Sequence, residues 1–202
     1  MKIFPALLAM LLLAACQNVP ITGRSQLQMI SEGAEASLGL SAYQDVLQKE
    51  KISQDPKLNE LVTRVGSRIA AATGRTDYKW EFRVIDNDAL ANAFCLPGGK
   101  VAVYTGILPV TQDEAGLAAV IGHEVAEGIA RHGGERMSQQ LLLEGVALAA
   151  AVSSKDEHKA ELYATLLGVG ATFGILLPYS RLHESEADRM GLIYMAKAGY
   201  DP

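Results

Sequence analysis

Apolar residues recur every three or four positions through much of this chain, which is the period of helices with one buried face. Residues 56–72 show the pattern most clearly. Asp55 suits the N-cap, Pro56 suits the first helical position, and Gly74 follows the last turn. The same period predicts further helices over residues 31–51, 111–132, 135–152, 157–177 and 180–198.

Two short segments follow the two-residue period of a strand instead. The first is residues 80–85, which the polar run Asp86-Asn87-Asp88 closes, and the second is residues 100–105, entered through the turn Pro97-Gly98-Gly99. Helices with only two strands predict an α+β fold that is predominantly helical.

The first sixteen residues carry an export signal. Lys2 supplies a positive charge, and residues 3–13 are apolar but too short to span a bilayer permanently. Leu13-Ala14-Ala15-Cys16 has the residue order of a bacterial lipobox, so we predict a signal peptide over residues 1–15 and a lipid on Cys16. An ordinary signal peptide, or an uncleaved anchor that contains Cys16, is the alternative. Gln17 after the cysteine favours sorting to the outer membrane over inner-membrane retention.

The rest of the chain divides into a tether and one domain. We predict a lipidated tether over residues 16–30 and a domain over residues 31–202. Gly199 ends the last helix and Asp201-Pro202 has the signature of another helix start, so we expect the domain to continue beyond this sequence. If Cys16 is lipidated, Cys95 has no partner, and the fold cannot depend on a disulfide within the chain.

The composition of the chain limits the classes of partner that it can be expected to bind. The chain has 202 residues, is 49% hydrophobic and carries a net charge of −5 without clusters of lysine and arginine. This argues against nucleic acid, and against an anionic membrane surface, as the main partner. Residues 163–177 are apolar but short and contain glycines, which favours a buried or lid helix over a membrane span. The apolar region 140–178 suits core, a groove wall or a membrane-facing patch.

The strongest chemical signal is Val120-Ile-Gly-His123-Glu124-Val-Ala-Glu127. It lies in the helix over residues 111–132, which a capping box at Thr111–Glu114 opens and Gly133-Gly134 ends. A zinc peptidase helix needs two ligands at i and i+4, on one face, and a glutamate beside the first as general base. His123 and Glu124 fill two of these positions, but Glu127 stands where a histidine is expected.

A second, weaker signal is Glu184 and Asp188, which are also four residues apart on a predicted helix. Such a pair on one helix face can supply a further metal ligand, Glu184, and a carboxylate that orients a ligand histidine, Asp188. Alone, the pair is what any solvated amphipathic helix carries. His132, His158 and His183 are not convincing replacements for the missing histidine, because none has the spacing or the surrounding motif.

Taken together, these motifs resemble the metallopeptidase family of HtpX and the CAAX prenyl protease, and most closely its bacterial lipoprotein branch of BepA-like and LoiP-like proteins. The resemblance rests on the His123 motif, the Glu184 motif about sixty residues later, and residues 92–106 and 198–202, and it covers roughly residues 25–202. It implies a gluzincin fold with a small sheet packed beside the zinc helix. It also implies one zinc ion per chain, bound by His123 and Glu184, with Glu124 as the base and Glu127 in the remaining ligand position.

The resemblance further implies that residues 91–105 help to bind extended polypeptide. The residues concerned are Asn92, Ala93, Phe94, Gly98 and Gly99. Physically, an edge strand accepts a substrate as one more strand through main-chain hydrogen bonds. The alternative is that this segment is an ordinary core hairpin.

Two function classes follow from Glu127. A carboxylate binds zinc at about 2.0–2.2 Å, so a site with His123, Glu127 and Glu184 is geometrically possible, although its extra negative charge should lower activity. The leading hypothesis is a zinc metalloendopeptidase of envelope protein quality control, lipid-anchored on the periplasmic side of the outer membrane. The alternative is a catalytically impaired pseudo-peptidase that binds misfolded or unassembled envelope proteins as a chaperone or assembly factor. An engineered or erroneous residue at position 127 is a third explanation.

Overall fold

The computed structural model describes residues 16–153 and 177–202. These residues belong to two compact units. The first unit contains the described residues 16–19, 23–30, 132–153 and 177–185, and the second contains residues 20–22, 31–131 and 186–202. The predicted signal peptide, His158 and residues 157–176 of a predicted helix lie outside the described residues.

A three-stranded sheet forms the centre of the second unit. Its strand order is β3 (Glu81–Ile85), β5 (Lys100–Tyr104), β4 (Ala93–Leu96). The central strand pairs parallel with β3 and antiparallel with β4. The two strands predicted from alternation are both present, shifted by one residue at one end each. Alternation alone does not predict β4, which forms one edge of the sheet.

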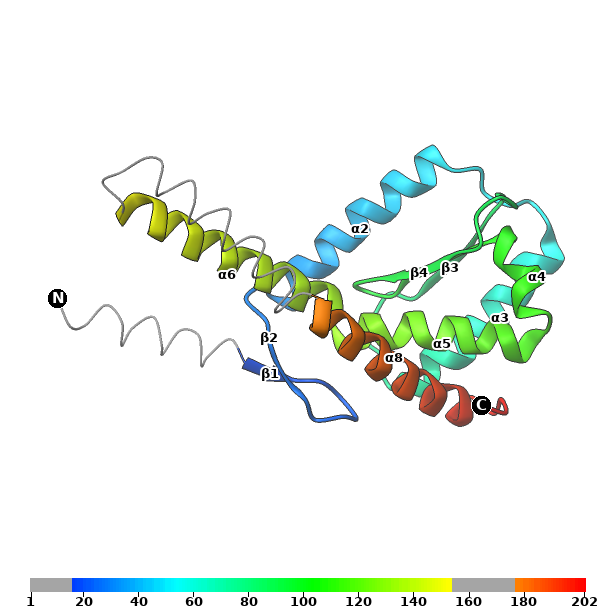
Figure 1. The fold of residues 1–202 in the computed structure, drawn as a ribbon. Helices are drawn as coiled ribbons and strands as arrows, with labels where there is room; N and C mark the ends of the chain where they lie inside the picture. The colour runs from blue at the N-terminus through cyan, green and yellow to red at the C-terminus, as the bar shows by residue number, and fades with distance from the viewer. Residues whose placement is uncertain (1–15, 154–176) are drawn as a thin grey trace. The chain divides into compact units, whose positions relative to one another are not determined.

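Helices cover both faces of this sheet (Figure 1). On one face lies α2 (Glu32–Lys49), whose Tyr43 is buried against a cluster formed by Ile85, Ala102 and Tyr104. On the opposite face lie α3 (Pro56–Thr73) and α5 (Glu114–Ala130). The sheet is therefore a buried layer between helices, and the predicted fold class, α+β and predominantly helical, is confirmed.

Close backbone approach holds α3 and α5 against the sheet. A Cβ atom added at Gly66 of α3 would lie 2.4 Å from the ring of Phe82, and one added at Gly128 of α5 would lie 3.0 Å from Cys95 Sγ. Larger residues at these positions would push the helices away from the strands. The small sheet thus packs directly beside the helix that carries His123, as expected.

The ends of α3 agree with the sequence pattern. The Asp55 side chain accepts hydrogen bonds from the backbone N–H groups of Lys57 and Leu58, and Pro56 opens the helix. Gly74 closes it in a left-handed conformation, with φ of 73°. Local capping contacts are sufficient to predict both ends of α3, because each of these contacts lies within one helical turn.

The ends of α5 differ from the prediction. A short turn η1 (Thr105–Ile107) and α4 (Leu108–Thr111) precede it, so Thr111 ends one helix and does not open the next. The N-cap is Asp113, whose side chain accepts from Gly116 N at 2.8 Å. The helix ends before Arg131, which adopts a left-handed conformation with φ of 59°. The predicted glycine stop is wrong, since Gly133 and Gly134 lie inside α6 (His132–Ser153).

Arg131 takes the conformation usually left to glycine because its side chain is held from elsewhere. Its Nε and Nη2 atoms donate to the two carboxylate oxygens of Glu35 on α2, at 2.8 Å each, and both side chains are buried. A paired, hydrogen-bonded charge of this kind compensates the cost of a positive φ.

The first unit contains a two-stranded sheet and the helix α6. Strand β1 (Cys16–Asn18) pairs antiparallel with β2 (Ser25–Leu27), so Cys16 lies opposite Leu27. Residues 16–30, which are predicted to be a tether, thus include a folded hairpin that contacts α6. The last helix, α8 (Leu177–Lys197), contributes residues to both units. In the part of the chain that the structure describes, no helix is long and apolar enough to cross a bilayer.

Candidate active site

The predicted catalytic residues lie on the one partly open face of α5. His123, Glu124 and Glu127 are half-buried, whereas residues 121–122, 125–126 and 129–130 are buried. Positions i, i+1 and i+4 fall on one side of a helix. The sequence spacing and the burial pattern therefore agree that these three side chains point in the same direction.

Asp188 of α8 contacts His123. The Nδ1 atom of His123 lies 2.8 Å from Oδ1 of Asp188, and the histidine side chain is 25% exposed. A carboxylate on one imidazole nitrogen fixes the ring orientation and favours coordination through the other nitrogen, which is the usual environment of a metal-bound histidine. The contact suits the predicted orienting role of Asp188, and the role itself stays a prediction.

Two glycines make this contact possible. A Cβ atom added at Gly122 would lie 3.0 Å from Gly191 O, and one added at Gly191 would lie 2.9 Å from His123 N. The backbones of α5 and α8 are thus in direct contact at this point. Asp188 lies about one turn before Gly191, so its short side chain can reach the imidazole of His123.

Strand β4 borders the same face of α5. The Cys95 thiol lies next to Gly128, and burial, followed by the nearby carboxylates of Glu124 and Glu127, raises the pKa of this thiol well above its ordinary value. Cys95 is therefore a neutral thiol near neutral pH. Its electrostatic coupling to both glutamates also indicates that their carboxylates lie toward the β4 side of α5.

The hydrogen-bond pattern of β4 defines which groups face outward. Tyr104 N donates to Asn92 O at 3.0 Å, and Ala93 is paired in register with Val103. Because hydrogen-bonded and non-hydrogen-bonded pairs alternate in antiparallel sheets, Phe94 also bonds toward β5. The main-chain N–H and C=O groups of Ala93 and Cys95 consequently point away from β5, toward the outer edge of the sheet.

The predicted substrate-binding residues fall into two groups. Asn92, Ala93 and Phe94 lie at the start of this edge strand. Gly98 and Gly99 form the turn into β5, each with φ of 86°, and Gly99 packs so closely on Trp80 that an added Cβ would lie 2.9 Å from the indole. The glycines are required by the turn geometry, and their part in substrate binding stays a prediction.

Glu184 belongs to a different unit from the residues on α5. It is exposed on α8, one turn before Asp188, and lies in the first unit, whereas His123, Glu127 and Asp188 lie in the second. Across residues 16–153 and 177–202, no group of three or more His, Cys, Asp and Glu side chains lies close enough to hold a metal ion. His123 and Glu127 have suitable chemistry and spacing for a divalent metal, while the full ligand set stays a prediction.

The residue before Glu184 belongs to a buried polar cluster that the sequence did not predict. The rings of His183 and His132 stack with centroids 4.3 Å apart, and His183 Nε2 lies 2.8 Å from Glu135 Oε2. Arg24 donates to both carboxylate oxygens of Glu135, at 2.7 and 3.0 Å. Both histidines are fully buried in this cluster, which explains why neither suits the place of the missing zinc ligand.

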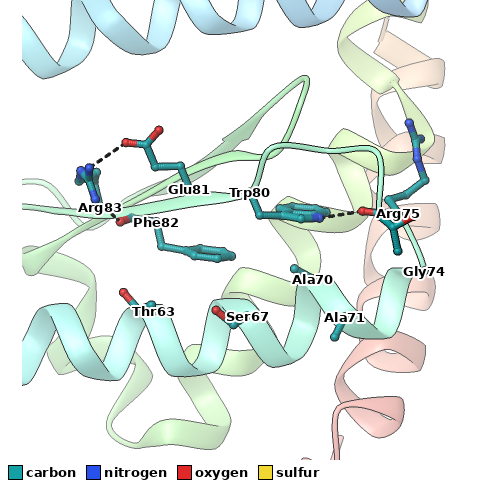
Figure 2. Close-up of a pocket in the computed structure, with 11 residues that line it drawn as sticks. Thr63, Ser67, Ala70, Ala71, Gly74, Arg75, Trp80, Glu81, Phe82 and Arg83 are labelled. Carbon is teal, nitrogen blue, oxygen red and sulfur yellow. Dashed lines mark hydrogen bonds and ion pairs between the residues drawn. The ribbon is translucent and has the colours of Figure 1, made fainter.

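A groove on the opposite edge of the sheet is separate from these residues. It has a volume of about 520 Å³ and lies between α3 and β3 (Figure 2). Trp80 and Phe82 stack along it, with ring centroids 6.3 Å apart, above the small residues of α3 (Figure 2). None of the predicted site residues lines this groove, so it is not the candidate active site.

Comparison with known proteins supports a peptidase. The sequence profile described as Peptidase family M48 matches residues 56–202. The chain is 39% identical over 189 residues to the mitochondrial metalloendopeptidase OMA1 of Schizosaccharomyces pombe, a match that covers 92% of this chain and 54% of the relative.

Bacterial relatives match over similar lengths. The chain is 31% identical over 223 residues to the putative beta-barrel assembly-enhancing protease of Vibrio cholerae, covering 100% of this chain and 44% of the relative. It is 26% identical over 195 residues to the beta-barrel assembly-enhancing protease of Escherichia coli, covering 93% and 39%. The chain thus spans about half the length of these relatives or less. The profile match covers most of the chain and includes both candidate motifs, and on this evidence the chain belongs to peptidase family M48.

Proposed function

We propose that this chain is a zinc-dependent metalloendopeptidase that acts on envelope proteins in quality control. The observation that carries the proposal is the geometry around His123. Its Nδ1 atom contacts Asp188 at 2.8 Å, and Glu124 follows it on the open face of α5. Membership of peptidase family M48, and the metalloendopeptidase and protease names of several relatives, support the same activity.

The proposed zinc ligands are His123, Glu127 and Glu184, one ion per chain. Imidazole and carboxylate groups are both common zinc ligands. A zinc ion held there would supply Lewis acidity to a water molecule and to the scissile carbonyl group. Asp188 holds the imidazole of His123 in one orientation, so that only Nε2 can face such an ion.

Glu124 is the proposed general base. It is half-buried beside His123 and, together with Glu127, lies close enough to the Cys95 thiol to affect its pKa. Its carboxylate would take the proton from the attacking water molecule, since it stands one residue after the first ligand on the same open helix face.

Strand β4 would bind the substrate. The outward N–H and C=O groups of Ala93 and Cys95 can pair with an extended polypeptide, which would then run beside the open face of α5. Such recognition depends on the main chain, so it selects unfolded or unassembled chains over compact folded ones. The names of the beta-barrel assembly-enhancing relatives support envelope proteins as the substrates. A lipid on Cys16 would place the enzyme at the periplasmic side of the outer membrane.

A second function is supported by one specific residue. Glu127 gives the ligand set an extra negative charge, which lowers the Lewis acidity of a bound ion. With metal binding or catalysis impaired, the same edge strand would still bind polypeptide. The chain would then act as a chaperone or assembly factor for envelope proteins.

Zinc analysis and a casein cleavage assay on the full chain separate these two functions. The peptidase predicts one zinc per chain and cleavage that Glu124→Gln abolishes, with zinc content retained. Glu60→Gln is the matched control, because Glu60 is an exposed glutamate on α3 outside the site, and it should change neither quantity.

Glu127→His tests whether these residues form a metal site that Glu127 impairs, or form no metal site. The absence of zinc and cleavage in the parent chain, with both restored by Glu127→His, would establish the polypeptide-binding alternative. If neither the parent nor Glu127→His binds zinc, the proposed metal site is wrong.

A further inference from the structure

The predicted lipidation site lies on a folded element. Cys16 is exposed and is the first residue of β1, directly opposite Leu27 of β2. Three residues of strand span about 10 Å. A lipid on Cys16 would therefore be attached at the end of a short hairpin, with no flexible segment between the acyl chains and the folded first unit.

The hairpin is fixed to the beginning of α6. Arg24 forms a two-point ion pair with Glu135, whose side chain is buried, and Met29 N donates to Ser138 Oγ at 2.9 Å. Gln26 of β2 is also buried. Buried, charge-assisted contacts of this kind hold their partners in one geometry. The position of Cys16 relative to α6 is consequently set by the fold of the first unit.

The same unit is rich in exposed apolar side chains. Half of the large apolar residues that are exposed in the described chain belong to it, although it is much the smaller unit. Along α6, Met137, Leu141 and Leu148 are 36%, 48% and 66% exposed. At about 100° per residue these three lie within about 40° of one another around the helix. They form an apolar stripe, which soluble surfaces rarely leave uncovered.

We propose that the stripe of Met137, Leu141 and Leu148 rests on the lipid bilayer to which Cys16 is anchored. The inference depends on the proposed lipidation of Cys16, because acyl chains at that residue bring the first unit against the membrane. Glu144 lies on the same side of α6 and is exposed, so the stripe sits at headgroup depth, as interfacial helices do. The chain is acidic overall, so apolar contact, not charge, provides the attraction.

Site-specific fluorescence quenching tests the contact on the full chain. Acylated protein is reconstituted in phosphatidylcholine vesicles with Leu148→Cys as the labelling site in a Cys95→Ser background. Val146→Cys is the matched control, since Val146 is 46% exposed but points to the opposite side of α6. We expect nitroxide-labelled lipids to quench the probe at position 148 several-fold more than at position 146, with iodide showing the reverse order.

Equal lipid quenching at the two positions would overturn the proposal. Protection of position 148 from iodide without lipid quenching would also overturn the proposal. If that protection depends on protein concentration, the stripe binds a second copy of the chain. If the protection requires added unfolded casein, the stripe binds polypeptide. Intact mass reports acylation of Cys16 separately. In a Cys16→Ser chain added to the same vesicles, preferential quenching at position 148 would show that the stripe contacts the bilayer without the anchor.

Discussion

The Nδ1 atom of His123 and the Oδ1 atom of Asp188 lie 2.8 Å apart, although the two residues are 65 positions apart in the chain. Asp188 is otherwise exposed, at 70% of its side-chain surface, so its role in stability is small. Its carboxylate should instead determine how well His123 binds a metal ion. Asp188→Asn removes the charge but keeps the shape, and we expect the affinity for zinc to fall by roughly 10–100-fold.

The measurement is zinc titration calorimetry on the full chain, accompanied by urea unfolding. Unfolding should be nearly unchanged in Asp188→Asn. Asp45→Asn, a substitution at an exposed aspartate of α2 far along the chain from the site, should leave zinc affinity unchanged. Equal affinities for the parent and Asp188→Asn would show that the contact has no part in metal binding.

The close approach of Gly122 and Gly191 should be sensitive to a single methyl group. In Gly191→Ala the new Cβ would meet backbone atoms of Gly122 and His123 at 2.9 Å, which cannot rotate away as a side chain can. We expect the free energy of unfolding to fall by about 1–3 kcal/mol. The contact between His123 and Asp188 should also be lost, as seen in the imidazole nitrogen shifts.

Gly145→Ala is the matched control for this substitution. It also replaces a helical glycine, but nothing lies within 4 Å of its Cβ position. There the alanine should stabilise the protein by about 0.5–1 kcal/mol, because glycine is the less favourable residue in a helix interior. A stabilised Gly191→Ala protein would contradict the packing of α5 on α8.

The buried pair of Arg131 and Glu35 should be one of the most sensitive points of the second unit. Arg131→Met leaves Glu35 buried without its guanidinium partner, and we expect a loss of about 3–5 kcal/mol in urea unfolding. Replacing both residues by methionine should cost less than replacing Arg131 alone, because no unpaired charge remains. By contrast, Arg64→Met removes an exposed ion pair with Glu114 and should cost at most about 1 kcal/mol. Similar losses for the two single variants would refute the buried role.

The cluster around Glu135 predicts a pH dependence. Burial acts to raise the pKa of Glu135, but hydrogen bonds from His183 and Arg24 outweigh it and hold the pKa below its ordinary value. A lowered folded-state pKa contributes stability that is fully present above the unfolded value, about 4.3, and is lost as pH falls through the folded value. The free energy of unfolding should therefore decrease as the pH falls below about 4.3.

In Glu135→Gln this part of the acid dependence should disappear, although the variant is less stable at neutral pH. Glu144→Gln alters an exposed glutamate of the same helix and should keep the slope of the parent chain. The measurement is the urea midpoint of unfolding at a series of acidic pH values. If the midpoint of Glu135→Gln falls with pH as steeply as that of the parent chain, the acid sensitivity belongs to other groups.

Sequence reasoning succeeded where the determining contacts are local. The ends of α3 depend on Asp55, Pro56 and Gly74, each of which acts within one turn of the helix. The open face of α5 follows from the spacing of His123 and Glu127 and from the apolar residues between them. The spacing of apolar residues and the identity of the capping residues are sufficient to predict features of this kind.

It failed where partners are distant in the chain. Arg131 ends α5 in place of a glycine because Glu35, 96 residues away, holds its side chain. Strands β1 and β2 have three residues each and show no alternation, and the contact of Arg24 with Glu135 spans 111 residues. A short stretch of sequence carries no signal of such distant pairs, which is why the hairpin within the predicted tether was not foreseen.

The outer edge of β4 offers the sharpest test of polypeptide binding. Ala93 directs its N–H away from β5, so Ala93→Pro removes one outward donor while leaving the ladder between β4 and β5 intact. Ala93→Ser keeps the N–H and is the matched control. We expect Ala93→Pro to weaken binding of unfolded casein by roughly 5–10-fold, the loss of about one hydrogen bond, with little change in urea unfolding. Equal binding by the proline and serine variants, both folded, would remove β4 from the substrate path. The measurement holds for peptidase and chaperone alike, because it follows binding and not cleavage.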